Sequence, residues 1–319
     1  MEGRRLNVYN ILAMAIISAA VLGCLVLVLR SESPKPEGDG NYVAALQEMD
    51  KEDFPAAIEF FRKSLKSSPK NGTVYLGMAR AYVRLQDWDK ALESADKALE
   101  YGPDSAAAHA QRGVIFKLMG YPEKALKDLS RATELNPQYA WAYAHIAAVR
   151  MRQEDLEKAL TNINRALALN PDFADALRLR ALILTKSTKY KEAYEDFDRL
   201  EKTLPQDAAC VQDKAWFLLT CPDESFRDAA GALELARRAY DLSKGRESRV
   251  LETLAEAYFQ NGQPEKAEEW QAKAIELETQ KCPDGACVGE MRMRLEKYQL
   301  AGREETRPQY QILPPRTNQ

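Results

Sequence analysis

Histidine and cysteine are scarce in this chain, which has two histidines and five cysteines among its 319 residues. No two cysteines have the CxxC spacing, so a zinc site of the usual kind is not expected. Cys210 and Cys221, if placed on one helix, would be about 16 Å apart and unable to bond, so they are interpreted as packing residues. Cys282 and Cys287 flank the turn-forming sequence PDGA, which suits either a small disulfide loop on an oxidising side or two ordinary thiols.

Signatures of catalysis and of nucleic-acid binding are also missing. There is no phosphate-binding Walker loop, no HExxH and no nucleophile elbow. His109 and His145 have no cysteine, serine or acidic partner at catalytic spacing, so both are interpreted as packing residues. The net charge is -3 over 45 basic and 48 acidic residues, which gives no bulk attraction to nucleic acid. The sequence therefore predicts a protein that is not an enzyme and has no cofactor, metal, small-molecule substrate or nucleic-acid partner.

One long apolar run stands at the N-terminus, where the whole of Ile11–Leu29 is free of charged residues. As a helix it would span about 28 Å, close to the hydrocarbon thickness of a bilayer. This length favours an uncleaved transmembrane helix, with the membrane as a partner. Two alternatives stay open: a cleaved signal peptide, and a lipoprotein processed at Cys24, since Val21-Leu22-Gly23-Cys24 is similar to a lipobox.

The charges around this run suggest an orientation. Arg4 and Arg5 precede it, whereas Arg30 and Lys35 follow among several acidic residues. This bias favours a cytoplasmic N-terminus. The expected localisation is a single-pass protein of the cell membrane with its C-terminal part extracytoplasmic. Residues 1–30 would form the anchor and residues 31–40, rich in Pro and Gly, a flexible linker.

The rest of the chain contains an internal repeat. Prolines recur at one constant interval, and an alanine precedes each of them at a second constant interval. The segments are alike, as in ALESADKALEYGP, ALKDLSRATELNP and ALTNINRALALNP. The prolines are Pro69, Pro103, Pro137, Pro171 and Pro205, and the alanines are Ala57, Ala91, Ala125, Ala159 and Ala193. A proline ends a helix because it cannot continue the hydrogen-bond ladder, and the pattern predicts two amphipathic helices per unit.

Small residues recur where the two helices of a unit, helix A and helix B, should cross. Numbering each unit from 1 to 34, these are positions 8, 20 and 27, which hold alanine in most units. Larger residues at positions 11 and 24, such as Tyr82, Ile163 and Phe197, should fill the space between units. Since one unit cannot bury its own apolar face, the units are expected to stack.

With this period and these small positions, the chain resembles the tetratricopeptide-repeat family over residues 38–281. The resemblance implies an all-α fold: a transmembrane helix, then a right-handed superhelix of about seven helix pairs. The units would be 38–71, 72–105, 106–139, 140–173, 174–207, 208–247 and 248–281. A capping helix within 282–302 and a disordered tail, 303–319, would follow. A segment of the sixth unit, AWFLLTCPDESFRDAAGALELARRAYDLS, looks like a variant found in bacterial repeat proteins and suggests a bacterial source. Together with the apolar span, this indicates a membrane-anchored bacterial type.

The resemblance also implies a function, the binding of partner segments in a concave groove formed by the A helices. Positions 2, 5, 9, 12 and 13 would form its wall, which is apolar with basic points and suits an extended apolar and acidic peptide or helix. The predicted wall residues are Leu76, Arg80, Val83, Arg84, Val114, Lys117, Leu118, Trp141, Ala148, Met151, Arg152, Arg178, Leu182 and Lys186.

Position 5 lacks the lysine of a chaperone-binding carboxylate clamp, so binding of chaperone tails is disfavoured. The first expectation is a membrane-tethered scaffold. The alternatives are an accessory factor in envelope biogenesis (secretion, pilus or cytochrome assembly) and an enzyme with an unrecognised active site. The sequence leaves open the partner, the pathway and the oligomeric state.

Overall fold

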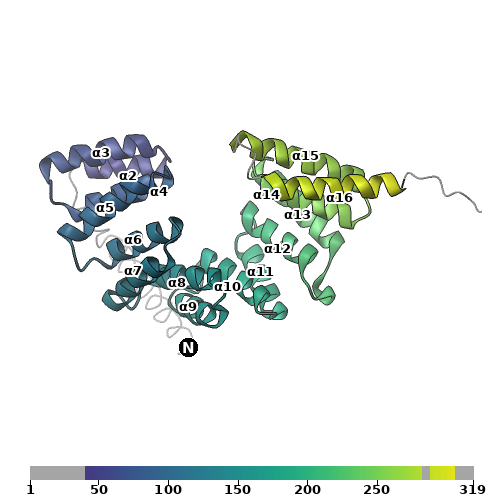
Figure 1. The fold of residues 1–319 in the computed structure, drawn as a ribbon, viewed down its shortest axis with the longest axis horizontal. Coiled ribbons are helices and arrows are strands. Elements are labelled where there is room, and N and C mark those ends of the chain that lie inside the picture. The colour runs from purple at the N-terminus through teal and green to yellow at the C-terminus, as the bar shows by residue number, and fades with distance from the viewer. Residues whose placement is uncertain (1–39, 282–287, 306–319) are drawn as a thin grey trace, which may run out of the picture. The chain divides into compact units, whose positions relative to one another are not determined.

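The computed structural model describes residues 40–281 and 288–305, and this part of the chain contains fifteen α-helices, one short 3-10 helix and no strand (Figure 1). It divides into two compact units, one ending at Gln111 and the other beginning at Arg112. The boundary falls within α6, Ala106–Leu118.

The first unit contains two complete helix pairs. They are α2 (Gly40–Asp50) with α3 (Phe54–Ser67) and α4 (Gly72–Arg84) with α5 (Trp88–Tyr101). The helices of each pair pack on each other, and α3 also packs on α4. The pairs are therefore stacked in chain order within this unit.

The second unit continues the same alternation. Its helices are α7 (Pro122–Leu135), α8 (Ala140–Arg152), α9 (Leu156–Leu169), α10 (Ala174–Lys186), α11 (Tyr190–Thr203), α12 (Ala208–Thr220), α13 (Ala229–Ser243), α14 (Ser248–Gln260), α15 (Pro264–Lys281) and α16 (Gly289–Glu305). Consecutive helices from α7 to α16 pack on one another. The A helices α4, α6, α8, α10 and α12 begin at evenly spaced residues, and their interval is that of the prolines.

Local chemistry sets the turn between the two helices of a unit. Asp53, Asp87 and Asp155 cap their B helices by accepting a backbone N–H bond three residues ahead. At position 15 of the repeat, which is one residue before the residue that caps helix B, the backbone has a positive φ. This holds in every repeat unit except the sixth, whose turn is longer. Glycine adopts this conformation easily at Gly120, with φ of 81°. Elsewhere the position holds the bulkier residues Glu52, Gln86, Glu154 and Thr188, with φ between 58° and 61°, or a second glycine, Gly262, in the seventh unit.

The core contains the small residues expected at the helix crossings. Ala79, Ala91, Ala147 and Ala159 have no exposed surface. At Gly113 a Cβ atom would lie 2.8 Å from the side chain of Leu129, so only glycine allows this approach.

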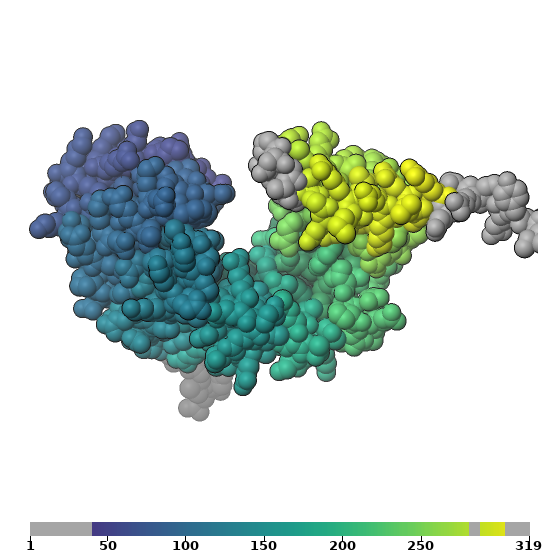
Figure 2. All heavy atoms as spheres, in the orientation of Figure 1, coloured from purple at the N-terminus to yellow at the C-terminus, as the bar shows by residue number. Residues whose placement is uncertain are grey.

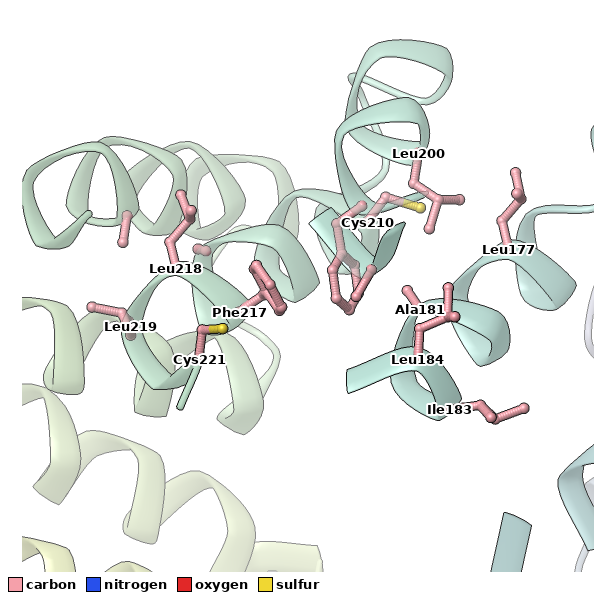
Figure 3. Close-up of a cluster of buried hydrophobic side chains, with 14 of the residues drawn as sticks. Leu177, Ala181, Ile183, Leu184, Leu200, Cys210, Phe217, Leu218, Leu219 and Cys221 are labelled. Atoms are coloured by element: carbon pink, nitrogen blue, oxygen red, sulfur yellow. The ribbon is translucent and has the colours of Figure 1, made fainter. Parts of the chain in front are cut away.

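A continuous apolar cluster runs from α8 to α16 and includes both free cysteines of the described residues, Cys210 and Cys221. Both are buried, and they lie among leucines and a phenylalanine in Figure 3. The packing role predicted for these two cysteines is confirmed.

The sixth pair has a longer turn, which contains the 3-10 helix η1, Glu224–Phe226. Phe226 from this turn contacts Tyr194 and Phe217. After the seventh pair, α16 covers α14 and α15: Tyr298 is fully buried against Phe259. The opposite side of α16 is open to solvent, as Figure 2 shows in yellow.

The predicted all-α fold of successive helix pairs is confirmed, whereas the predicted localisation needs correction. No helix among residues 40–281 and 288–305 is both long and apolar enough to cross a membrane. This finding contradicts the predicted single-pass membrane protein. The expected span Ile11–Leu29, the linker, Cys24, the Cys282–Cys287 pair and the tail from residue 306 lie outside the described residues.

Candidate functional site

The A helices of neighbouring pairs lie side by side in the second unit. α8 contacts α10, and α12 contacts α14. We define the A-helix wall as positions 2, 5, 9, 12 and 13 of the helices α6, α8 and α10. The A-helix wall includes only residues from 112 to 186. It contains ten of the fourteen residues predicted to bind a partner. The other four lie in the first unit.

The four predicted residues that lie in the first compact unit, before Arg112, differ in exposure. Leu76 is buried and packs with Leu99 and Ala108, so it supports the core. Val83 is half-buried, and Arg80 is exposed. Arg84 is ion-paired with Glu52 at 2.9 Å and covers the ring of Phe54.

The apolar members of the A-helix wall are graded in exposure. Val114 is buried, and Ala148 and Met151 are half-buried. Leu118 is 41% exposed and Leu182 44% exposed. The two leucines therefore offer apolar surface to a ligand, whereas Val114 mainly holds the helices together.

Lys117, His145 and Trp141 form a contact between α6 and α8. The Nζ of Lys117 lies 3.1 Å from Nδ1 of His145. Because a protonated amine only donates, Nδ1 is the acceptor, which places the imidazole proton on Nε2. The indole of Trp141 meets the imidazole edge-on at 4.1 Å and stacks on Tyr139. The aromatic side chain is thus fixed on both sides.

Burial shifts the pKa values of the two titratable members of this contact. Burial lowers the pKa of Lys117 to about 8, and the positive charge of Arg152 contributes to the same shift. Burial, with a smaller effect from Lys117, lowers the pKa of His145 to about 3. The imidazole is therefore neutral at physiological pH and cannot compensate the charge of Lys117.

Arg178 is held by acidic groups. Its Nε lies 2.5 Å from Oδ2 of Asp213, in a contact that is an ion pair without hydrogen-bond alignment. Asp175 is 3.5 Å away, and an Nη2–H points at the sulfur of Cys210 at 3.4 Å. Burial raises the pKa of the Cys210 thiol to about 11, so this thiol is protonated and is no nucleophile.

Ion pairs join the turn of one repeat unit to the A helix of the next repeat unit. Glu52 pairs with Arg84, and Glu154 pairs with Lys186, each at 2.9 Å. In both cases the glutamate is at position 15 of one unit and the cation at position 13 of the next. We call this arrangement the charge ladder. The third unit has Gly120 at position 15, and Arg152, which follows it in the ladder, has no ion pair among the described residues.

A pocket of about 230 Å³ lies on α12, α14 and α16, which sequence reasoning missed. It is lined by Gln212, Trp216, Arg249, Glu252, Thr253 and Arg294. Arg294 pairs with Glu252 and covers the indole of Trp216, and Gln212 donates to Thr253 at 2.9 Å. Four of these residues occupy positions 2, 5 and 9 of the sixth and seventh units. The same position rule, extended past Pro205, would have found them.

The comparisons with known proteins agree with this architecture. Models described as tetratricopeptide repeat match residues 48–113, 106–139, 146–208 and 224–286. Because together they cover more than half of the sequence, the chain belongs to the tetratricopeptide-repeat family. These models describe the repeat and do not distinguish the membrane-anchored bacterial type. A comparison with curated proteins found no match.

Solved structures share the fold at low sequence identity. A tetratricopeptide repeat protein from Parabacteroides merdae is 17% identical with a TM-score of 0.60, covering 81% of this chain and 97% of that one. A thermophilic repeat protein of Thermus thermophilus is 21% identical with a TM-score of 0.52, covering 56% and 98%. A chain of the APC/C hetero-tetramer Cut9–Hcn1 is 13% identical with a TM-score of 0.65, covering 80% and 48%.

Proposed function

We propose that this protein is an interaction scaffold whose A-helix wall binds an extended segment of a partner protein that carries apolar and acidic side chains. Tetratricopeptide-repeat proteins generally mediate protein–protein interactions, and one structural neighbour is part of a hetero-tetramer. The observation that carries the proposal for this chain is a combination of two features. Leu118 and Leu182 are exposed, and Lys117 and Arg152 have no acidic partner within the described part of the chain.

Apolar contacts supply most of the affinity in this proposal. Burying the exposed parts of Leu118 and Leu182, and of Met151 and Trp141 in the same A-helix wall, removes apolar surface from water, which contributes about 25 cal/mol per Å². An exposed charge such as Arg152 contributes only about 0.2–1 kcal/mol. Its effect is to speed association and to orient the segment. We therefore expect affinity to depend chiefly on the leucines.

A selection from a library of random nonapeptides, with the full chain immobilised, tests the proposal. Wild type should enrich peptides with alternating apolar and acidic residues. Leu182→Glu should abolish this enrichment because it places a charge among the apolar residues of the A-helix wall. The control is Leu85→Glu, since Leu85 is 42% exposed but lies outside the A-helix wall. If Leu182→Glu enriches the same peptides as wild type, or if wild type enriches none, the A-helix wall does not bind an extended partner segment and the proposed function is wrong.

A further inference from the structure

Two cations on the helices α6 and α8 interact electrostatically without an acidic partner in the part of the chain that the structure describes. Lys117 on α6 and Arg152 on α8 form no ion pair among the described residues, and their charges repel. The polar contact of the Lys117 amine is to the neutral imidazole of His145 at 3.1 Å. Lys117 is half-buried, and a lysine that is withdrawn from water is usually paired with an acidic group. The pair is thus an uncompensated charge at the surface proposed to bind a partner.

The charge ladder explains how this charge arises. At the corresponding places Glu52 neutralises Arg84 and Glu154 neutralises Lys186. Gln86 precedes Leu118 and Thr188 precedes Thr220, with no charge on either side, whereas Gly120 precedes the cation Arg152 and offers it no carboxylate. A glycine is not required there, because glutamate adopts a left-handed backbone conformation at Glu52 and Glu154. A Cβ atom at Gly120 would also meet nothing within 4 Å. The missing carboxylate is therefore a local feature of this step and not a demand of the fold.

We propose that Lys117 and Arg152 form a carboxylate-binding subsite, in which an acidic side chain of the bound segment takes the place of the glutamate absent at position 120. This inference rests on the proposed function, since the carboxylate belongs to the partner. The guanidinium of Arg152 offers paired N–H donors that match a carboxylate, and the amine of Lys117 adds a third cationic donor. Trp141 contacts the same imidazole that Lys117 contacts, so its indole gives apolar cover to the aliphatic stem of a glutamate.

Binding at this subsite is coupled to protonation of Lys117. A carboxylate beside the amine stabilises the charged form and raises its pKa. The described groups that act on the amine are His145, which accepts its hydrogen bond and stays neutral, and Arg152, which repels it. Above its pKa of about 8 the free protein holds Lys117 mostly neutral, so binding of the anion takes up a proton from solvent. Affinity for an acidic segment therefore falls as the pH rises above about 8.

The test follows the titration of Lys117 in the full chain by NMR of isotope-labelled dimethyl-lysine, with the signal assigned by Lys117→Arg. The probe is the acetylated tripeptide amide Leu-Glu-Leu, and its Gln analogue is the control ligand. We expect the Glu peptide to raise the titration midpoint by about one pH unit and the Gln analogue to leave it in place. Equal responses to the two peptides, or a response to inorganic phosphate alone, would overturn the assignment to a carboxylate.

Two variants at position 120 give the decisive comparison. Gly120→Glu restores the ladder, so it should raise the midpoint of Lys117 without ligand and remove the preference for the Glu peptide. Gly120→Gln introduces a side chain of the same size without the charge. It should keep the wild-type titration midpoint of Lys117 and the wild-type preference for the Glu peptide. Circular dichroism checks that Gly120→Glu retains the helix content of wild type. If Gly120→Glu loses helix content, Arg152→Gln, a change at an exposed residue, takes its place. A preference for Glu that survives in Gly120→Glu or Arg152→Gln refutes the subsite.

The two proposals fail separately. If the nonapeptide library enriches apolar and acidic peptides but the midpoint of Lys117 does not move, the scaffold function stands without this subsite. If the library enriches nothing while the tripeptide still shifts Lys117, the subsite stands as an anion site and the proposed function is wrong.

Discussion

The ion pair between Arg180 and Asp196 allows a sharp prediction about stability. Arg180 on α10 donates from Nε and Nη2 to the two carboxylate oxygens of Asp196 on α11, at 2.7 and 2.6 Å. The guanidinium also donates to Asn164 at 3.2 Å. The two partners differ in burial: the Asp196 side chain is 6% exposed and that of Arg180 is 26% exposed.

This difference in burial predicts an asymmetry between the two single variants. Arg180→Ala leaves a buried carboxylate without its partner, which costs about 3–5 kcal/mol. Asp196→Ala leaves an arginine that still reaches Asn164 and water, so we expect about 2–3 kcal/mol. The double variant should cost about 2 kcal/mol less than the sum of the two, because the second change removes the orphaned group. Asp172→Ala, which breaks the exposed pair with Arg199, should cost at most about 1 kcal/mol.

Urea denaturation followed by circular dichroism measures these differences, and hydrogen exchange of α10 and α11 reports the local effect. The local measurement is needed because stacked repeats do not always unfold in one step. If Asp196→Ala proves more costly than Arg180→Ala, or if the coupling in the double variant is near zero, burial does not decide the energetics of this pair and the reasoning is wrong.

Three further outcomes are expected. Ala159→Leu overpacks a crossing with no exposed surface and should cost about 1–3 kcal/mol in thermal unfolding; an unchanged midpoint would contradict the close approach of α8 and α9. Gly77→Ala places a Cβ atom 2.5 Å from the ring of Phe61 and should lower stability, while Gly40→Ala, which meets nothing, should not. Lys117→Met should stabilise the protein by about 1–3 kcal/mol at pH 7, because folding lowers the pKa of this lysine to about 8. Between pH 8 and 10.5 the native state of wild type holds fewer protons than the unfolded chain. The stability of wild type therefore rises over that window, and the stability advantage of Lys117→Met should shrink. An advantage that is independent of pH would point to packing alone.

The repeat itself was predictable from sequence because each unit solves the same packing problem. The alanine and proline periods identified the crossing residues, and Ala91 and Ala159 are indeed fully buried. The position rule also selected the A-helix wall. It did not show that Leu76 and Val114 are covered by neighbouring helices, since their exposure depends on how closely those helices approach.

The partners of the charged residues were less predictable for a geometrical reason. Glu154 and Lys186 are 32 residues apart, and they meet only because one turn lies beside the next A helix. A pattern within one unit contains no information about such a contact. The same holds for Lys117 and His145, which are 28 residues apart. Comparing position 15 of each unit with position 13 of the next would have revealed both the ladder and its interruption at Gly120.

The charge ladder also limits how far the repeats can be treated as interchangeable modules. Each of its ion pairs is divided between two repeat units, with the glutamate in one unit and the cation in the next. Deleting residues 140–173, a change that preserves the repeat period, would remove both Arg152 and Glu154 and bring the turn at Gly120 before Lys186. The interruption would then move to a new cation, with Leu182 in place of Ala148 beside it. A shortened chain of this kind would keep its helices in phase and yet present a different binding surface.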